Sequence, residues 1–426
     1  MLNKYSTSFR NLDQSEFYFI SKEAMEFVQL SFELESSKFT SNFLDQLKQS
    51  VAGLYSRCDG YKLYSINRNP DDIKVHRIPS QIKSLKEVNE WMHEQHTPDI
   101  SDHLAEIGSD EHRVVINSSH ICSDGGYLAS LIKGIQTQRG LPQHPKLPGS
   151  IVDILQCELK KADEKKNIKI AGFDEVTFLT NQKVDPTVPE LSKAHIMTAT
   201  DDVRNLACYD MNKDRPSGLT EHMWCALTLS FCALNDRLGP IGISTCVDFR
   251  RFVFPQTRIS NSMTNFFGCI NVVAGQINSQ SLRISDVSKM FRNHFNYIIE
   301  SDALFYSYLH PVELKDDVKP IAHLSNIGPI KYKSPIKDFE ISLRLNQKAQ
   351  QQSAQVMSYS KLKIDESGEN VISNDIHYQL AYSPANISDR LGRIIFQSFQ
   401  YFMRNIKPSM LLNDAYNEMK RFQSTL

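Results

Sequence analysis

A histidine, an aspartate and two glycines follow a β-branched run, as His120, Asp124, Gly125 and Gly126. Histidine has an ordinary pKa of about 6.5, so it can take a proton near neutral pH and give it back. A general base must also be aimed at the reacting group and kept in one tautomer. A stiff strand that presents His120, followed by a tight turn, suits that chemistry.

Two interpretations of this segment stay open. In the first, Gly125 and Gly126 take backbone conformations that other residues resist, and Asp124 fixes the loop by a local bond or by pairing with a distant cation. In the second, the segment is a plain strand–turn–helix corner in which Asp124 caps the helix. The spacing of the residues does not choose between them.

The elements that must position this loop alternate between strand and helix, which indicates α/β organisation. In the first half we expect strands at 26–34, 61–66 and 113–117 and helices at 39–55, 83–95 and 125–137. In the second half we expect a long amphipathic helix at 219–238, strands at 241–249, 268–275, 321–326, 338–345, 354–362 and 376–383, and helices at 283–299 and 388–405.

Length and composition predict two domains. The 426 residues exceed one ordinary core, and breaks rich in proline and glycine interrupt the chain at 136–150 and 184–191. We therefore predict an N-terminal domain at 1–165, a crossover linker at 166–194 and a C-terminal domain at 195–426.

Charge and cysteine usage narrow the function classes. The chain has 48 basic and 49 acidic residues and no long basic block, which argues against a nucleic-acid partner. It shows no apolar run of transmembrane length and no signal peptide. Its eight cysteines are scattered without a C-x-x-C pair, which predicts reduced thiols in a cytoplasmic protein and neither a zinc site nor a redox motif.

Several common catalytic motifs are absent from the sequence. It contains no G-x-x-x-x-G-K-[ST], no G-x-G-x-x-G after a strand, no G-x-S-x-G and no H-E-x-x-H. Phosphate-cradling nucleotide enzymes, dinucleotide oxidoreductases, α/β-hydrolases and zinc proteases are therefore disfavoured. We expect no bound cofactor and no metal. The His120 loop remains the main candidate for a catalytic site.

The loop resembles a known motif. The hexapeptide 120–125, His-Ile-Cys-Ser-Asp-Gly, resembles the His-x-x-x-Asp-Gly core of the CoA-dependent acyltransferase superfamily. The segments 245–255 and 265–273 resemble its Val-Asp-x-Arg and Asn-x-x-Gly segments, and 323–330 resembles the Ser-Asn-x-Gly strand end of the fungal alcohol acetyltransferase branch. Residues 12–19 resemble the usual opening, so order and spacing match over nearly the whole chain.

This resemblance implies two chloramphenicol acetyltransferase-like α/β domains, each a mixed β-sheet flanked by helices, with an active-site tunnel at their interface. It implies that His120 is the general base, which deprotonates a hydroxyl or amine as that group attacks an acyl thioester in a ternary complex. Acyl-CoA, and first acetyl-CoA, would be the co-substrate. Asp124 would hold the loop by pairing with Arg250. We expect Arg250 to follow Asp248 on a strand.

Further residues are candidates for charge stabilisation and substrate binding. The negative charge that develops on the thioester oxygen needs a hydrogen-bond donor, and Ser325 and Asn326 at a strand end are candidates. The same residues are equally compatible with a plain strand-to-turn transition. Asn265 and Gly268 would shape the tunnel floor.

The sequence departs from parts of the superfamily. Ser119 replaces the first of the two histidines that many members carry, but the second histidine holds the base role. The Asp-Phe-Gly-Trp-Gly motif of the plant branch and a carrier-protein segment are both absent. The leading hypothesis is acyl transfer to an apolar alcohol or a sphingoid-type amine. The alternatives are a condensation-type, carrier-dependent acyltransferase and a non-catalytic relative that binds.

Two features bear on the acceptor and on location. Five phenylalanines cluster near the expected tunnel and either line it or belong to the core: Phe249, Phe252, Phe254, Phe266 and Phe267. The terminal helix either lies on a membrane or packs in the core, and the small number of basic residues along its apolar face favours the core. The resemblance adds peripheral contact with endoplasmic reticulum or lipid droplets, and a monomer is compatible with the sequence.

Overall fold

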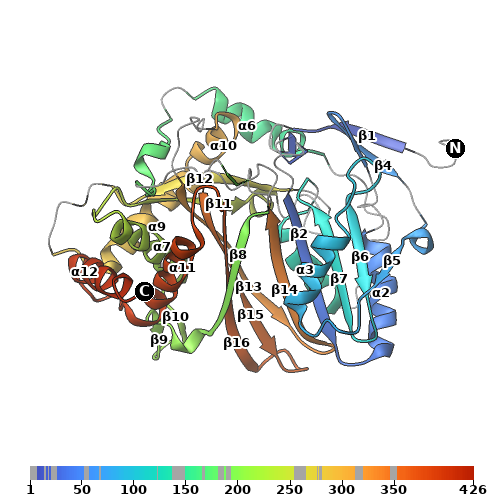
Figure 1. The fold of residues 1–426 in the computed structure, drawn as a ribbon. Helices are drawn as coiled ribbons and strands as arrows, with labels where there is room; N and C mark the ends of the chain where they lie inside the picture. Colours follow the sequence, from blue (N-terminus) through green and yellow to red (C-terminus); the bar gives the residue numbers. More distant parts are fainter. Residues whose placement is uncertain are drawn as a thin grey trace.

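The structure is a computed structural model. It describes residues 7–13, 16–17, 19–20, 26–51, 57–66, 69–121, 123–136, 149–165, 168–180, 187–188, 193–253, 265–275, 277, 281–311, 320–345 and 353–426. Two large mixed sheets stand side by side, and helices cover their outer faces (Figure 1). The predicted α/β class with two mixed-sheet units is confirmed.

The first sheet carries the histidine loop at the end of its middle strand. Its order is β14 (Ile336–Leu345), β2 (Glu26–Leu34), β7 (Arg113–Ser119), β6 (Ala105–Ser109) and β5 (Val75–Arg77). Helix α3 (Leu85–Gln95), which begins with a capping box of Ser84 and Glu87, packs on β2 and β7. Because Val114, Val115 and Ile116 are fully buried, β7 is enclosed on both faces and holds its end in a fixed position.

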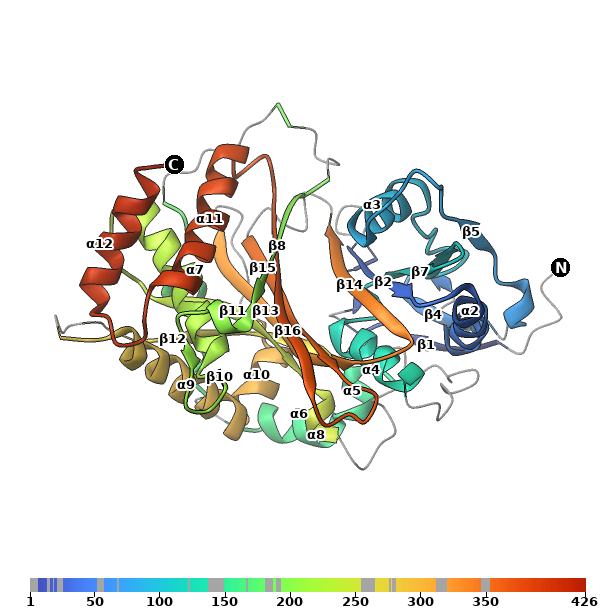
Figure 2. The ribbon, with the colours of Figure 1, turned by 90° about the horizontal axis from the view of Figure 1, so that it is seen from below.

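The second sheet has six strands. Its order is β12 (Phe267–Val273), β11 (Gly242–Asp248), β13 (Ile321–Tyr332), β15 (Ser353–Ile364), β16 (Val371–Tyr382) and β8 (His195–Asp202). Strands β11, β13 and β15 run parallel, and the other pairs are antiparallel. Figure 2 shows α7 (Leu219–Leu234), α9 (Ile284–Glu300), α11 (Asp389–Asn405) and α12 (Leu412–Gln423) on the face turned away from the first sheet.

Helix α7 differs from its predicted character. Every residue from Glu221 to Ala233 is buried, whereas the sequence pattern predicts an amphipathic helix. The reason is that α7 lies between the sheet and the outer helices α9, α11 and α12, so it has no solvent face. Helix α11 is the amphipathic one. It buries one face against α7, as the core interpretation of the terminal helix predicted.

Helix α4 (Gly125–Gln136) joins the two halves. It follows the histidine loop, and its apolar residues Tyr127, Leu128, Leu131 and Ile132 share one core with residues of β2, β7, β13 and β15. Figure 2 shows it between the two sheets. The loop before α4 is therefore clamped by its helix against both sheets.

Strand β14 belongs to the first sheet although it follows β13 of the second sheet directly in sequence. It pairs antiparallel with β2, and Gln379 of β16 accepts a hydrogen bond from the Leu343 N–H at 3.2 Å across the gap between the sheets. The division into 1–165 and 195–426 stays a prediction for the chain as a whole. At β14, however, the C-terminal half supplies a strand to the N-terminal sheet.

Several elements were not predicted. They are β1 (Thr7–Asn11), β3 (Arg57–Asp59), β5, β6, β8, β9 (Tyr209–Asp210), β10 (Arg215–Pro216), α5 (Ile151–Ile154), α6 (Gln156–Asp163), α8 (Arg250–Val253), α10 (Ala303–Leu309) and α12. Strand β1 pairs with β4 (Lys62–Ile66), which lies where a strand was expected. Among the described helices, none combines the length and the apolar character that crossing a membrane requires.

Candidate active site

His120 follows the last residue of β7 and lies between two aromatic rings. Its main-chain N–H donates to the Glu26 carbonyl oxygen at 2.9 Å, which fixes the backbone where the strand ends. The imidazole stacks on Phe19, with ring centroids 4.7 Å apart, and lies 5.3 Å from the ring of Phe267. The residue is only 7% exposed, and Nδ1 is buried while Nε2 is not enclosed.

Burial controls the charge of this ring. It lowers the pKa of His120, and the nearby Asp124 carboxylate and the backbone at His120 and Ser123 oppose it without reversing the direction. The imidazole is therefore neutral near neutral pH. A neutral imidazole is the form that a general base requires.

Serines close the loop around the histidine. The hydroxyls of Ser118 and Ser123 lie 2.7 Å apart, and the Ser123 hydroxyl donates to the Ser119 carbonyl oxygen at 2.9 Å. The Ser118 hydroxyl lies 3.0 Å from the carbonyl oxygen of Val28 on the neighbouring strand. Because all three serines are buried, these contacts replace water and make the turn rigid.

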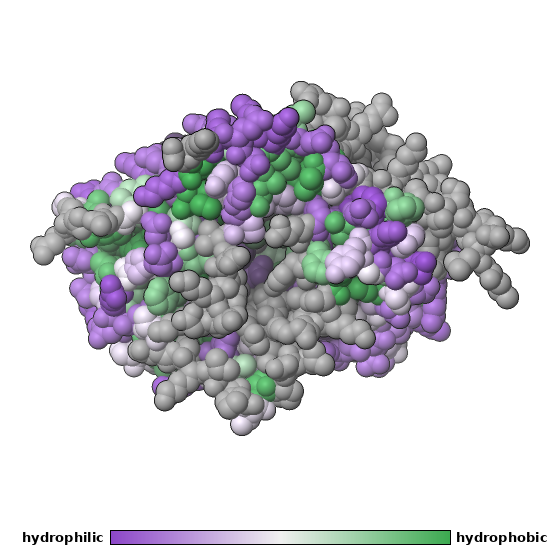
Figure 3. Space-filling model, turned by 90° about the horizontal axis from the view of Figure 1, so that it is seen from above, coloured by the Kyte–Doolittle hydropathy of each residue, from purple (hydrophilic) through white to green (hydrophobic). Residues whose placement is uncertain are grey.

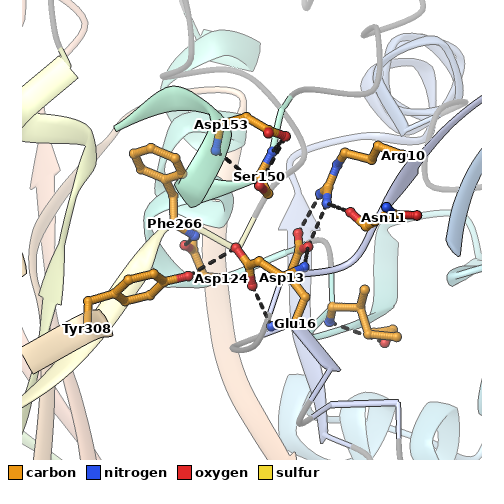
Figure 4. Close-up of polar contacts among 11 residues, drawn as sticks. Arg10, Asn11, Asp13, Glu16, Asp124, Ser150, Asp153, Phe266 and Tyr308 are labelled. Atoms are coloured by element: carbon orange, nitrogen blue, oxygen red, sulfur yellow. Dashed lines mark hydrogen bonds and ion pairs between the residues drawn. The ribbon is translucent and has the colours of Figure 1, made fainter. Parts of the chain in front are cut away.

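Asp124 both caps α4 and pairs with a distant cation, so the roles that the two interpretations gave to this carboxylate are both present. Its Oδ1 accepts the Tyr127 N–H at 2.8 Å. Its Oδ2 accepts the Phe266 N–H at 2.8 Å and Nη1 of Arg250 at 2.9 Å. Figure 4 shows the carboxylate beside Phe266. Burial alone would raise the pKa of Asp124, but the Arg250 guanidinium and these hydrogen bonds lower it by more. The pKa therefore lies below its ordinary value, and the carboxylate stays ionised.

Arg250 reaches Asp124 by a route that differs from the predicted one. Strand β11 ends at Asp248, and Arg250 opens the short helix α8 instead of continuing the strand. Its N–H donates to Oδ1 of Asp248 at 2.9 Å, and its guanidinium lies 3.2 Å from the same oxygen. The predicted pairing with Asp124 is present, but the turn into α8, and not strand alternation, directs the side chain.

Gly125 and Gly126 are required for space and not for unusual backbone angles. Neither has a positive φ, which corrects the predicted reason for them. A Cβ at Gly125 would lie 2.7 Å from Cδ1 of Ile327 on β13. A Cβ at Gly126 would lie 2.6 Å from Nη1 of Arg250. The first turn of α4 thus touches the second sheet and the guanidinium directly.

Ser325 and Asn326 lie within β13 and not at its end, which corrects both the strand-end and the strand-to-turn interpretations. The register with β15 shifts between Asn326 and Gly328. The Asn326 amide donates to Oγ1 of Thr220 on α7 at 2.9 Å, and its oxygen accepts the Ser358 hydroxyl at 3.2 Å. Asn326 therefore serves the packing of α7.

Ser325 has the opposite orientation to Asn326. Along β13, Ala322 and Leu324 point into the core under α7, so Ser325 points toward the first sheet. It is half-buried, and its hydroxyl contacts the Cys246 thiol, whose pKa the Cys269 thiol and burial raise well above its ordinary value against the opposing effect of Ser325. Of the two predicted oxyanion donors, Ser325 is the one on the wall that faces the histidine sheet.

Asn265 and Gly268 flank the segment that binds Asp124. Asn265 is 2% exposed, and both polar atoms of its amide have no hydrogen-bond partner within the part of the chain that the structure describes. It directly precedes Phe266, whose N–H binds Asp124. A Cβ at Gly268 would lie 2.8 Å from the ring of Phe249, so this glycine lets β12 lie on an aromatic ring of the core.

The phenylalanine cluster is mostly core. Phe249 and Phe266 are fully buried, and Phe249 contacts the rings of Phe305 and Tyr308 on α10. Phe252 is partly buried against the same core. Phe267 is the member that contacts His120, and Phe254 lies outside the described residues. The prediction that these rings together line a tunnel is therefore wrong for Phe249 and Phe266.

Sequence reasoning missed a tie between the opening segment and the second half. Arg10 forms an ion pair with Glu16, and the Glu16 N–H donates to Asp13 at 2.9 Å. The Tyr308 hydroxyl of α10 donates to the other Asp13 oxygen at 3.0 Å, as Figure 4 shows. These contacts anchor the segment that brings Phe19 onto the imidazole.

A cysteine and histidine cluster was also missed. Sγ of Cys246 lies 3.5 Å from Sγ of Cys269 and 3.5 Å from Nε2 of His323. The three residues come from β11 and from its neighbours β12 and β13. They are far apart in the sequence, so no short motif predicts that they meet. Glu26 lies nearby on the first sheet, where burial and the Cys269 thiol raise the pKa of its carboxyl to about 8.

Seen from above, the molecule has a recess near its centre, with hydrophilic residues visible at its bottom (Figure 3). Cys269 lies on the edge strand β12 and is exposed, and Cys246 on the neighbouring strand β11 is half-buried. Solvent therefore reaches this end of the second sheet.

Comparison with known proteins identifies the fold. No protein-family model and no curated protein sequence matches the chain. Polyketide synthase associated protein 5 from Mycobacterium tuberculosis superposes with a TM-score of 0.60 at 12% identity, over 94% of this chain and 98% of that one. The condensation domain of Monacolin K polyketide synthase MokA superposes with a TM-score of 0.59 at 9% identity, over 96% of this chain and 100% of that one. The chain shares the fold of condensation domains.

A third structure of this fold holds a ligand. A mutant starter condensation domain of rhizomide synthetase RzmA, in complex with C8-CoA, superposes with a TM-score of 0.60 at 10% identity, over 95% of this chain and 96% of that one. The likeness supports the architecture that the sequence resemblance implied, two mixed sheets with the histidine loop between them.

Proposed function

We propose that the protein is an acyltransferase that moves an acyl group, first of all acetyl, from acyl-CoA to the hydroxyl or amine of an apolar small molecule. The observation that carries this proposal is the setting of His120. Its imidazole is neutral and lies between Phe19 and Phe267, and Nε2 is not fully enclosed. A residue kept only for packing would not need a free nitrogen there.

The chemistry is direct transfer in a ternary complex. Nε2 of His120 removes the proton of the acceptor O–H or N–H while that atom attacks the thioester carbonyl carbon. The tetrahedral intermediate collapses, the C–S bond breaks, and the CoA thiolate leaves as the imidazolium returns a proton to it. No acyl-enzyme forms, because the acceptor attacks the thioester itself.

The remaining residues have supporting roles in this proposal. Asp124, Arg250, Gly125 and Gly126 hold the loop, since the carboxylate is fully used by Arg250 and two N–H groups. The Ser325 hydroxyl is the proposed donor to the developing oxyanion. The free amide of Asn265 is a second candidate, whereas Asn326 is committed to α7.

A second candidate function is condensation-type transfer from a carrier-bound thioester. It is favoured by the two condensation domains among the structures that share this fold, and C8-CoA in one of them extends the range of donors to test. A non-catalytic binding relative is the third candidate, and the intact loop with an open Nε2 argues against it.

The test is release of free thiol by the purified protein. Acetyl-CoA and octanoyl-CoA are offered with a panel of alcohols and long-chain amines, and the same acyl groups are offered on a pantetheinylated carrier protein. We expect release from CoA that depends on the acceptor, is lost in His120→Ala and is retained in His112→Ala, an exposed histidine before the same strand. Transfer from the carrier alone supports the second candidate, and no transfer with any donor supports the binding relative.

The acceptor class is tested by chain length. If the acceptor subsite is apolar, each buried methylene adds about 0.8 kcal/mol of binding, so kcat/KM rises across a homologous series before levelling off. Phe267→Ala should reduce that rise, because Phe267 is the described phenylalanine in contact with His120. A flat or falling series from the shortest acceptor onward would identify a small polar substrate.

A further inference from the structure

The Cys246, Cys269 and His323 side chains project from one face of the second sheet. Cys246 is directly opposite Cys269 in the antiparallel pair of β11 and β12, and His323 lies on β13, next to β11. Their neighbours along the strands, Val247, Ile270 and Leu324, point into the core on the other face of the sheet. The strand order alone therefore brings two thiols and one imidazole together on the face toward the first sheet.

The separations of the ligand atoms match the edges of a tetrahedral metal site. With Zn–S bonds of about 2.3 Å and Zn–N bonds of about 2.0 Å, tetrahedral angles place two sulfurs about 3.8 Å apart and a sulfur and nitrogen about 3.5 Å apart. The Cys246 thiol is 3.5 Å from both other atoms, and all three atoms lie within 4.8 Å of one another. The third edge joins Sγ of Cys269 and Nε2 of His323, and a small side-chain rotation would bring these two atoms to the tetrahedral separation.

We propose that Cys246, Cys269 and His323 bind one zinc-like divalent ion, with water at the fourth coordination position. Two thiolates balance the charge of the ion, and a set of two cysteines and one histidine with an open position is an established zinc-binding pattern. The exposure of Cys269 and the partial exposure of Cys246 give the ion a path from solvent. The proposal does not rest on the acyl transfer proposed above, although the Ser325 hydroxyl contacts the Cys246 thiol.

A disulfide between the two cysteines is the competing outcome. A disulfide bond is about 2.05 Å long, whereas the two sulfurs lie 3.5 Å apart, and bond formation also needs an oxidant. Metal binding is favoured because it needs no redox partner and also accounts for the position of His323, which a disulfide does not use.

The test begins with the full-length protein, reduced and stripped of metal. Zn²⁺ is titrated against a chromophoric indicator, and Co²⁺ is added separately to look for thiolate-to-cobalt charge-transfer absorption. We expect one ion per chain. Removing a residue that only hydrogen-bonds to a metal ligand costs about 10–100-fold in metal affinity. Removing a ligand should cost more, so we expect Cys246→Ser, Cys269→Ser and His323→Ala each to weaken binding at least about 100-fold. The matched control is Cys157→Ser, which removes an exposed cysteine on α6.

Thermal melts keep the result interpretable if a variant is less stable. Zn²⁺ should raise Tm in the wild type, in Cys157→Ser and in His120→Ala, and should leave Tm unchanged in a folded Cys246→Ser variant. Equal zinc binding in wild type and Cys246→Ser overturns the proposal, as does cobalt binding without a thiolate band. A Cys246–Cys269 disulfide in the freshly purified protein, with no bound metal, also overturns it.

Discussion

Two regions of the molecule each bury a histidine beside an acid that pairs with an arginine. In the His120 loop the acid is Asp124, and its partner is Arg250. In α7 the neighbouring residues Glu221 and His222 are both buried, and Glu221 forms an ion pair with Arg292. Burial lowers the pKa of both histidines, and that of His222 falls to about 4.

The two regions differ in access and in the depth of the ion pair. Both ring nitrogens of His222 are enclosed and have no hydrogen-bond partner among the described residues, whereas His120 leaves Nε2 open. The Arg292 side chain is 45% exposed, against 9% for Arg250. Burial and an adjacent acid are thus common to a packing position and a candidate active site. What separates them is one reachable nitrogen on a loop that cannot move.

The largest expected effect separates the two histidines by activity. His120→Ala should lower kcat by about 10²–10⁴-fold, which is the usual cost of losing a general base, with little change in Tm. His222→Ala should keep kcat within a few-fold and lower Tm instead, because it leaves a hole against Phe402. Steady-state kinetics and melts measure both. An equal loss of kcat in a folded His222→Ala variant would break the distinction.

The next effect compares the two ion pairs. Asp124→Asn leaves the buried Arg250 guanidinium with only the half-exposed Asp248 as a charge partner, and the cost should approach the loss of about 3–5 kcal/mol in the free energy of unfolding that breaking a buried ion pair causes. Glu221→Gln should cost clearly less, because solvent reaches Arg292. Urea unfolding gives both values, and a double-mutant cycle of Asp124→Asn with Arg250→Ala should show strong coupling. Strict additivity would mean that the Arg250 contact contributes nothing.

A smaller effect tests why the loop excludes side chains. Gly126→Ala should destabilise the protein by about 1–3 kcal/mol, since the new methyl group overlaps the Arg250 guanidinium. Helix propensity alone would stabilise this substitution by about 0.5–1 kcal/mol, so the sign of the change isolates the overlap. Ser130→Ala on the same helix serves as the control. A stabilised Gly126→Ala variant would show that the loop can yield.

The smallest effect appears in the pH dependence. The pKa of His222 is about 4 in the folded protein and about 6.5 when unfolded, so the unfolded chain binds more protons between these values. Stability should therefore fall by roughly 2 kcal/mol more in wild type than in His222→Phe between pH 7 and pH 5.

For His120 the same direction of shift appears in activity. Only the neutral imidazole accepts the proton, so kcat/KM should fall on the acid side with a midpoint below the ordinary histidine pKa. His222→Phe should leave that midpoint unchanged. A midpoint above the ordinary value would mean that the burial of His120 is relieved in the working enzyme.

Local patterns were sufficient for many elements and for the loop. The segment 26–34 was predicted as a strand and is β2, because the alternation of apolar and polar residues specifies an extended chain. A helix was expected at 125–137, and α4 covers Gly125–Gln136 of the described residues. The sequence left open whether Asp124 is a helix cap or the partner of a distant cation, and it is both, since its two oxygens have different partners.

The amino-acid sequence by itself determined the strands, the helices and the presence of a histidine, an acid and two glycines in one rigid turn, because these depend on neighbours along the chain. Only the tertiary structure decided which groups meet across the fold. It placed β14 in the first sheet, turned Arg250 through α8, directed Asn326 away from the cleft and gathered Cys246, Cys269 and His323. These contacts depend on strand order and on which helix covers which face, and no local spacing encodes either of them.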